Sequence, residues 1–244
     1  SIGDFLMASY LFERFLINFP RSIHAQESKF MIAYCHYQET PEYSLDATNT
    51  IKAISKFQDF IDKYSSANEV PSAIENRDAL AYEISSNEHT IQSYKSFIKK
   101  YPNATQVSVA WSHIYDIDFE NAKSVNKASA YYDHMNSYSK SSHFDEALNL
   151  SYECEFNETI IEHRIESYLE FVNRFGAKNP NKPIALDTLF NHYEQELNFD
   201  GMEFCVNKAN NKQREKLVLR YHDVYTTDGE WTTLNKFYNK YNDE

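Results

Sequence analysis

The sequence predicts an all-α protein: a right-handed superhelix (solenoid) of about five to six tetratricopeptide-like helical hairpins with a divergent C-terminal cap. Three observations support this prediction. A short aromatic phrase recurs along the chain, the chain has only four glycines, and no segment alternates apolar and polar residues between hairpin turns. The last two observations argue against β sandwiches and barrels.

The recurring phrase places large apolar residues at i, i+3, i+4 and i+7, which is one face of an α-helix. Its clearest copy consists of Tyr94, Phe97, Ile98 and Tyr101. Copies beginning at Phe57, Tyr131 and Tyr168 lie at intervals of 37 residues from this one and from each other. Further copies begin at Phe12, 45 residues before Phe57, and at Leu234. A fixed period in the thirties is typical of stacked helical hairpins, each of which buries its apolar stripe against its neighbours.

The first hairpin is predicted at residues 4–19 and 24–38, with the small Ala33 where two helices approach closely. The first interval of the phrase contains eight extra residues, which the loop at 40–46 accounts for. An insertion in a tight array is the kind of loop that binds partners. The alternative is a spacer with one tucked tyrosine.

The later hairpins share one layout. Thr48 or Asn49 is expected to cap a phrase helix, and Pro71 suits the first turn of its partner helix. Tyr82 marks a position that Phe119 and Phe156 repeat at intervals of 37 residues, and we expect the partner helices to end near it. A polar turn, the next phrase helix and a break then follow.

The pattern loosens after residue 176, and helices are predicted at about 184–198, 201–210 and 212–225, with a capped final helix behind them. We divide the chain accordingly. Residues 1–80 contain the first repeats and an inserted loop at 40–48, residues 81–183 contain the regular repeats, and residues 184–244 form a divergent capping segment.

Composition restricts the function. The net charge of −12 and the lack of a Lys/Arg cluster argue against nucleic acid as a partner. The three cysteines, an odd number and far apart, predict no disulfide framework. No glycine-rich phosphate loop, nucleophile elbow or zinc motif is present, so we predict no catalytic residues, no cofactor and no metal. His192 and Glu196 are interpreted as a solvated helix pair, and a hydrolase or metal protein hidden after residue 184 is the remaining alternative.

The chain contains 19 tyrosines. Those in the phrase are expected in the core. Others, among them Tyr34, Tyr37 and Tyr43, either pack between helices or line the inner surface of the superhelix, where helical solenoids bind peptides.

Several segments resemble a known family. Ala8–Phe15 followed by Phe19–Ser22, and then Phe30–Tyr37, is similar to the first tetratricopeptide hairpins of the BamD family of outer-membrane-assembly lipoproteins. Pro41–Asp46 running into Thr50–Tyr64 resembles the extended loop that precedes that family's third repeat. The match is strongest over residues 1–80, where repeat pattern and insertion coincide.

The resemblance implies a non-catalytic scaffold at the periplasmic face of the outer membrane of a Gram-negative bacterium. Membrane contact would come only through a lipid anchor that is not present in this chain. The implied partners are a BamA-type outer-membrane barrel protein and unfolded outer-membrane proteins. The candidate protein-binding residues are Tyr34, Tyr37, Tyr43 and Asp46. The alternative function is a tetratricopeptide adaptor of another cell-envelope complex, in secretion, motility or peptidoglycan linkage.

Overall fold

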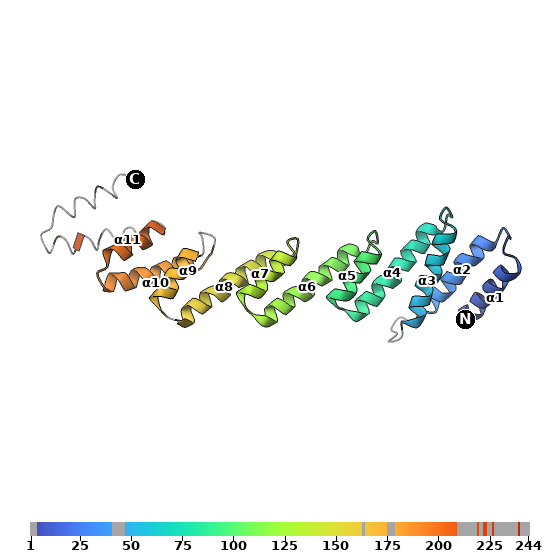
Figure 1. Cartoon of the computed structure of the whole chain (residues 1–244), viewed down its shortest axis with the longest axis horizontal. Helices are drawn as coiled ribbons and strands as arrows, with labels where there is room; N and C mark the ends of the chain where they lie inside the picture. Colours follow the sequence, from blue (N-terminus) through green and yellow to red (C-terminus); the bar gives the residue numbers. More distant parts are fainter. Residues whose placement is uncertain are drawn as a thin grey trace. The chain divides into compact units, whose positions relative to one another are not determined.

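The computed structural model describes these residues: 4–40, 47–162, 164–174, 179–208, 219, 222, 223, 226 and 239. Within them the fold is all-α and contains no strand, as the sequence predicts. The helices in chain order (Figure 1) are α1 (Phe5–Asn18), α2 (Ala25–Gln38), α3 (Thr48–Lys63), α4 (Val70–Glu88), α5 (Ile91–Lys100), α6 (Val107–Val125), α7 (Ala128–Ser137), α8 (Phe144–Glu162), α9 (Ile165–Arg174), α10 (Lys182–Gln195) and α11 (Phe199–Lys208).

The helix boundaries repeat with the period of the sequence. α4, α6 and α8 each contain 19 residues, and α5, α7 and α9 each contain 10. α4, α6 and α8 begin at intervals of 37 residues, and so do α5, α7 and α9. α10 contains only 14 residues, so the regular pattern ends there. The structure therefore confirms a helical repeat over the central part of the chain.

The chain divides into two compact units, Ser1–Asn121 with Tyr138–His143, and Ala122–Ser137 with Phe144–Glu244. In the first unit α1 packs on α2, α2 on α3, α3 on α4 and α4 on α5, so neighbours in sequence are neighbours in space (Figure 1). In the second unit the same holds for α7 through α11. Each unit is thus built from successive antiparallel helices.

The aromatic phrase supplies the core of each described repeat. Its buried members are Phe57, Phe60, Tyr94, Phe97, Tyr101, Tyr131, His134, Met135, Tyr168, Phe171 and Val172. The copy on α1 differs, because Phe12 and Phe15 are only half-buried and Phe19 is 59% exposed. The copy that begins at Leu234 lies outside the described residues.

Small residues let the helices approach one another. Ala73, Ala110 and Ala147 recur at intervals of 37 residues in α4, α6 and α8, and each is 0% exposed. Ala33 on α2, predicted from the sequence at a close approach, is also 0% exposed. A larger side chain at these positions would force neighbouring helices apart.

The connections also repeat. His89 and Asn126, again 37 residues apart, follow α4 and α6 with positive φ angles of 46° and 49°, the left-handed conformation that ends many helices. Thr90 then starts α5 with a capping box, in which its hydroxyl accepts from the backbone N–H of Ser93 and the Ser93 hydroxyl accepts from that of Thr90. Pro71 lies in the first turn of α4, as predicted.

Two local predictions are wrong. α4, α6 and α8 do not end near Tyr82, Phe119 and Phe156 but continue to Glu88, Val125 and Glu162. The aromatic residues lie inside the helices, from where Tyr82 packs against Phe97 and Phe156 packs against Phe171. The N-cap position of α3 is occupied by Ala47, whose side chain makes no capping hydrogen bond, so neither Thr48 nor Asn49 is the cap.

Candidate protein-binding surfaces

Two of the tyrosines expected to bind a partner lie together on α2. The ring of Tyr37 packs edge-on against Phe57 of α3 at a centroid distance of 6.3 Å. The ring of Tyr34 lies 6.1 Å from that of Tyr37 and stacks on Phe30 at 6.2 Å. Both tyrosines are half-buried, so each contributes to the core of the first unit and still presents part of its ring to solvent.

The other two candidates, Tyr43 and Asp46, lie outside the described residues. The structure therefore brings Tyr34 and Tyr37 together and leaves their partnership with the loop at 41–46 as a prediction.

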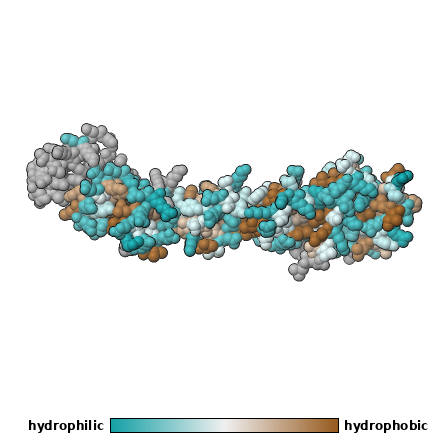
Figure 2. All heavy atoms as spheres, in the orientation of Figure 1, coloured by the Kyte–Doolittle hydropathy of each residue, from teal (hydrophilic) through white to brown (hydrophobic). Residues whose placement is uncertain are grey.

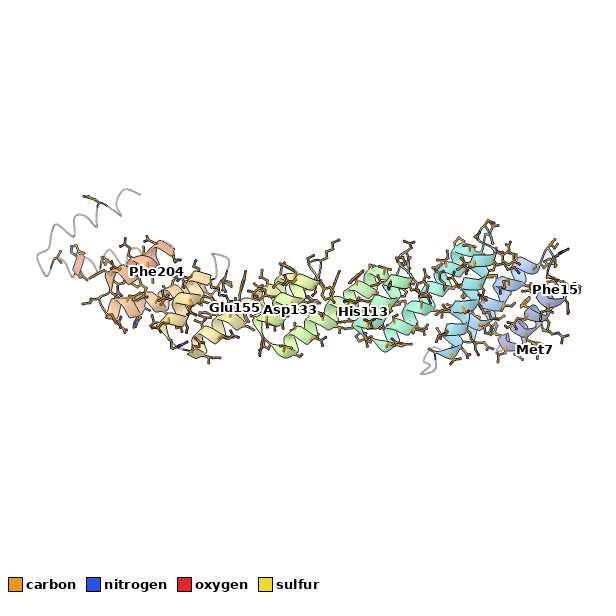
Figure 3. The ribbon with its side chains drawn as sticks, in the orientation of Figure 1. Met7, Phe15, His113, Asp133, Glu155 and Phe204 are labelled. Carbon is orange, nitrogen blue, oxygen red and sulfur yellow. The ribbon has the colours of Figure 1, made fainter. Side chains whose placement is uncertain are left out.

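A wide apolar surface covers one side of α1 and the turn after it. We call it the α1 surface, and it comprises Leu6, Met7, Tyr10, Leu11, Ile17, Phe19 and Ile23. Ile17 is 77% exposed and Ile23 is 90% exposed. The members on α1 share one face because the helix repeats every 3.6 residues. Apolar atoms reach the surface over these N-terminal hairpins in Figure 2, and Figure 3 labels Met7 and Phe15 on α1.

Arg14 carries the charge of the α1 surface. Its guanidinium donates to the Tyr10 hydroxyl at 3.1 Å and lies 5.9 Å from the centre of that ring. This contact fixes the cation above an aromatic face, so the surface combines apolar side chains with one positive charge.

The opposite side of α1 is tied to the neighbouring helices. Ser9 is buried and its hydroxyl lies 3.2 Å from Nε2 of His36 on α2, whose pKa is lowered mainly by burial. Lys56 of α3 donates to Glu13 at 2.8 Å. α1 is therefore seated on α2 by one face, and its apolar side chains on the other face are not needed for that packing.

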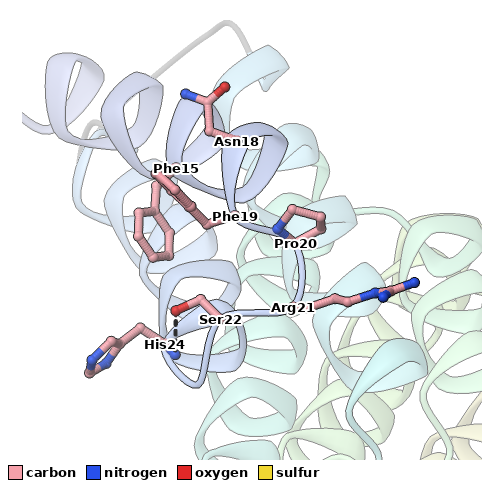
Figure 4. Close-up of a pocket in the computed structure, with 7 residues that line it drawn as sticks. All are labelled: Phe15, Asn18, Phe19, Pro20, Arg21, Ser22 and His24. Atoms are coloured by element: carbon pink, nitrogen blue, oxygen red, sulfur yellow. Dashed lines mark hydrogen bonds between the residues drawn. The ribbon is translucent and has the colours of Figure 1, made fainter.

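The turn after α1 is hollowed beside the α1 surface. Figure 4 shows the rings of Phe15 and Phe19 facing the hollow, with Arg21 and His24 pointing away in different directions. The two rings lie 5.5 Å apart, and the hollow has a volume of about 580 Å³. The hydroxyl of Ser22 accepts from the backbone N–H of His24 at 3.2 Å and holds the turn. The hollow extends the α1 surface onto the end of the hairpin.

A second concave region in the first unit is a groove of about 480 Å³ between α3, α4 and α5. Its apolar wall includes Ile51, Ile54 and Phe97, and its polar wall includes Glu88 and Gln92. Such a mixture of apolar contacts and hydrogen-bonding groups suits an extended peptide.

A histidine and tyrosine network lies between α4, α5 and α6. Nδ1 of His89 lies 3.0 Å from the Tyr94 hydroxyl, and Nε2 of His113 lies 3.1 Å from the Tyr82 hydroxyl. The ring of Tyr94 stacks on His113 at 5.1 Å, and burial raises the pKa of Tyr82. The hydroxyls of Tyr82 and Tyr94 thus each have a histidine nitrogen as hydrogen-bond partner.

The three cysteines are free thiols. Cys35 and Cys205 are buried, and burial raises the pKa of Cys205 to about 12. Among the described residues no group of three or more His, Cys, Asp and Glu side chains is placed to hold a metal ion. His192 and Glu196 form the pair expected from their spacing, with Nε2 and Oε2 3.3 Å apart.

Comparison with known protein families gives no match, and no curated protein matches the chain. Of the helices that the structure describes, none combines the length and the apolar character needed to cross a bilayer.

Sequence reasoning did not single out the α1 surface. The signal was present, because α1 is apolar nearly all round, from Phe5 to Ile17. Such a helix is normally covered on all sides. The phrase at Phe12 drew attention to one face and left the other, at Leu6, Tyr10 and Ile17, unexplained.

Proposed function

We propose that this protein is a non-catalytic binding scaffold whose tetratricopeptide-like hairpins wind into a right-handed superhelix at the periplasmic face of the outer membrane. The resemblance of residues 1–80 to the BamD family supports a BamA-type outer-membrane barrel protein as its partner. Unfolded outer-membrane proteins are its proposed clients. The all-helical repeat architecture is compatible with this role.

The observation that carries the proposal is the α1 surface. Large contiguous apolar patches on a protein surface mark sites of interaction. α1 exposes Leu6, Leu11 and Ile17 together. Burying one such side chain contributes roughly 1.5–3 kcal/mol, so a partner that covers several of them gains a substantial binding free energy.

The groove between α3, α4 and α5 supports the second part of the proposal. Outer-membrane proteins in transit expose extended segments in which apolar and polar residues alternate. The groove offers the exposed Ile51 and the half-buried Ile54 to apolar side chains and Gln92 to the peptide backbone. The scaffold would thus bind the BamA-type protein through α1 and an unfolded outer-membrane protein in the groove.

A binding measurement with purified proteins tests the proposal. We expect the full chain to bind the periplasmic domains of the BamA-type protein from the same organism in isothermal titration calorimetry. The double substitution Leu11→Asp with Ile17→Asp places two charges in the contact. We expect it to weaken binding at least about tenfold, since each tenfold change in Kd is only about 1.4 kcal/mol.

The matched control is Ile161→Asp with Ile184→Asp. These residues are 81% and 52% exposed, close to the 77% of Ile17 and the 58% of Leu11, but lie outside the α1 surface. The control variant is expected to bind as the unchanged protein does, and circular dichroism checks that both variants keep their helices. If both double substitutions weakened binding equally, the α1 surface would not be the binding site. No binding by the unchanged protein would reject a BamA-type partner.

A further inference from the structure

Glutamates make up four of the eight residues that line a small cavity in the second unit. It lies between α8 and α9, has a volume of about 150 Å³ and is bordered by Glu155, Glu158, Glu162 and Glu170. This volume far exceeds the roughly 10–15 Å³ that one water needs. Phe171 forms part of the wall, so the cavity combines negative charge with an apolar surface.

Glu155 has an unsatisfied oxygen at this cavity. The residue is 8% exposed, and its Oε1 accepts a hydrogen bond from the Tyr132 hydroxyl at 3.0 Å. Its Oε2 has no hydrogen-bond partner within the part of the chain that the structure describes. Figure 3 labels this residue on α8. A buried acceptor without a donor is unusual in a folded protein and calls for an explanation, such as a ligand that supplies the donor.

The positive charges near the cavity do not balance its carboxylates. Arg174 lines the cavity, and its charge lowers the pKa of Glu155, but burial has the larger effect and raises that pKa overall. Nη2 of Arg164 donates to Oε2 of Glu162 at 3.0 Å, and the Ser167 hydroxyl donates to the same oxygen. Among the residues described around the cavity, two arginines stand against four glutamates, which leaves an excess of negative charge.

We propose that this cavity binds the ammonium group of a lysine side chain presented by a protein partner, with Glu155 as the main acceptor and Glu158 at the rim. The methylene stem of lysine lies along Phe171, and its charged end reaches the carboxylates. The terminal torsion of glutamate is broad, so the Glu155 carboxylate can rotate toward the incoming donor, which moves both oxygens and exchanges the bond from Tyr132 for one from the ammonium group.

The chemistry favours an organic cation over a metal ion. No described group of three or more metal-binding side chains is placed to coordinate a metal at this site or elsewhere. Lysine suits the cavity better than arginine, because a compact ammonium needs one main acceptor whereas the planar guanidinium needs two in one plane. The site does not rest on the proposed function, since it lies in the second unit and its ligand class follows from its own residues.

The test is a titration of the full-length protein with three blocked amino acids: the acetyl methylamides of lysine, arginine and norleucine. Backbone amide shifts of Thr159 and Ser167, which line the cavity, report binding by nuclear magnetic resonance at constant ionic strength. We expect a saturable shift with the lysine compound, a weaker one with the arginine compound and none with the norleucine compound. Glu155→Gln is expected to weaken lysine binding at least tenfold.

Two further variants keep the test decisive. Glu158→Gln changes an exposed rim residue that folding does not need, and it is expected to weaken lysine binding several-fold. Glu153→Gln, an exposed glutamate of α8 outside the cavity, is the matched control and is expected to bind normally. The proposal is overturned if the three compounds shift the amides alike, or if Glu155→Gln and Glu158→Gln both bind lysine as the unchanged protein does. None of these outcomes depends on a BamA-type partner, so the two proposals fail separately.

Discussion

Replacing Phe57 by alanine is expected to lower the free energy of unfolding by about 3–5 kcal/mol, the range for removing a buried aromatic ring. Phe57 is 0% exposed and lies where α2 and α3 meet. Its ring centre is 6.2 Å from that of Phe30 and 6.3 Å from that of Tyr37. The helices cannot close the resulting cavity, because Ala33 and Ala53 already bring them into close contact.

Urea unfolding followed by circular dichroism measures this loss. Ile51→Ala on the same helix is the control, since Ile51 is 57% exposed and its truncation is expected to change stability by roughly 0.5 kcal/mol or less. Similar losses for the two variants would mean that the recurring aromatic phrase does not form the core of the repeats.

Asp78→Asn is expected to cost about 3 kcal/mol, because it leaves a buried guanidinium without its counter-charge. The side chains of Arg77 and Asp78 are only 13% and 6% exposed. Nε and Nη2 of Arg77 donate to the same oxygen of Asp78 at 2.9 and 2.7 Å, and Nη1 donates to Gln58 at 2.7 Å. The guanidinium also lies 5.0 Å from the ring centre of Tyr101, so it cannot turn to solvent without breaking several contacts.

The comparison pair is Lys56 and Glu13, whose side chains are 31% and 41% exposed. Glu13→Gln is expected to cost less than about 1 kcal/mol, since partly exposed ion pairs contribute little. The same urea experiment compares the two. Equal effects would show that burial does not strengthen the pair of Arg77 and Asp78.

The fold class and the repeat were predictable because they depend on periodic side-chain burial. The spacing of Tyr94, Tyr131 and Tyr168 at 37 residues predicts the 37-residue spacing of α5, α7 and α9. The ends of α4, α6 and α8 were not predictable from Tyr82 and its equivalents. α4 and α6 end at a residue in the left-handed conformation, His89 or Asn126. The identity of a histidine or asparagine alone does not predict that conformation.

The candidate surfaces were less accessible to sequence reasoning. Tyr34 and Tyr37 were identified, but only coordinates reveal that Tyr37 also packs against Phe57. The cavity at Glu155 was missed, because a glutamate in an amphipathic helix is ordinarily solvated and its burial arises from the docking of α9. The α1 surface was missed because exposure depends on which neighbours are present, and periodicity within one helix does not specify them.

The most direct test of the central claim is site-specific photo-cross-linking in the native cell. A benzoylphenylalanine is placed at Ile17 in the α1 surface or at Ile161 as the exposed control, and cross-linked proteins are identified by mass spectrometry. We predict a cross-link from position 17 to the periplasmic part of a BamA-type protein and none from position 161. Equal cross-linking from both positions, or capture of a different envelope complex at position 17, would contradict the proposed function.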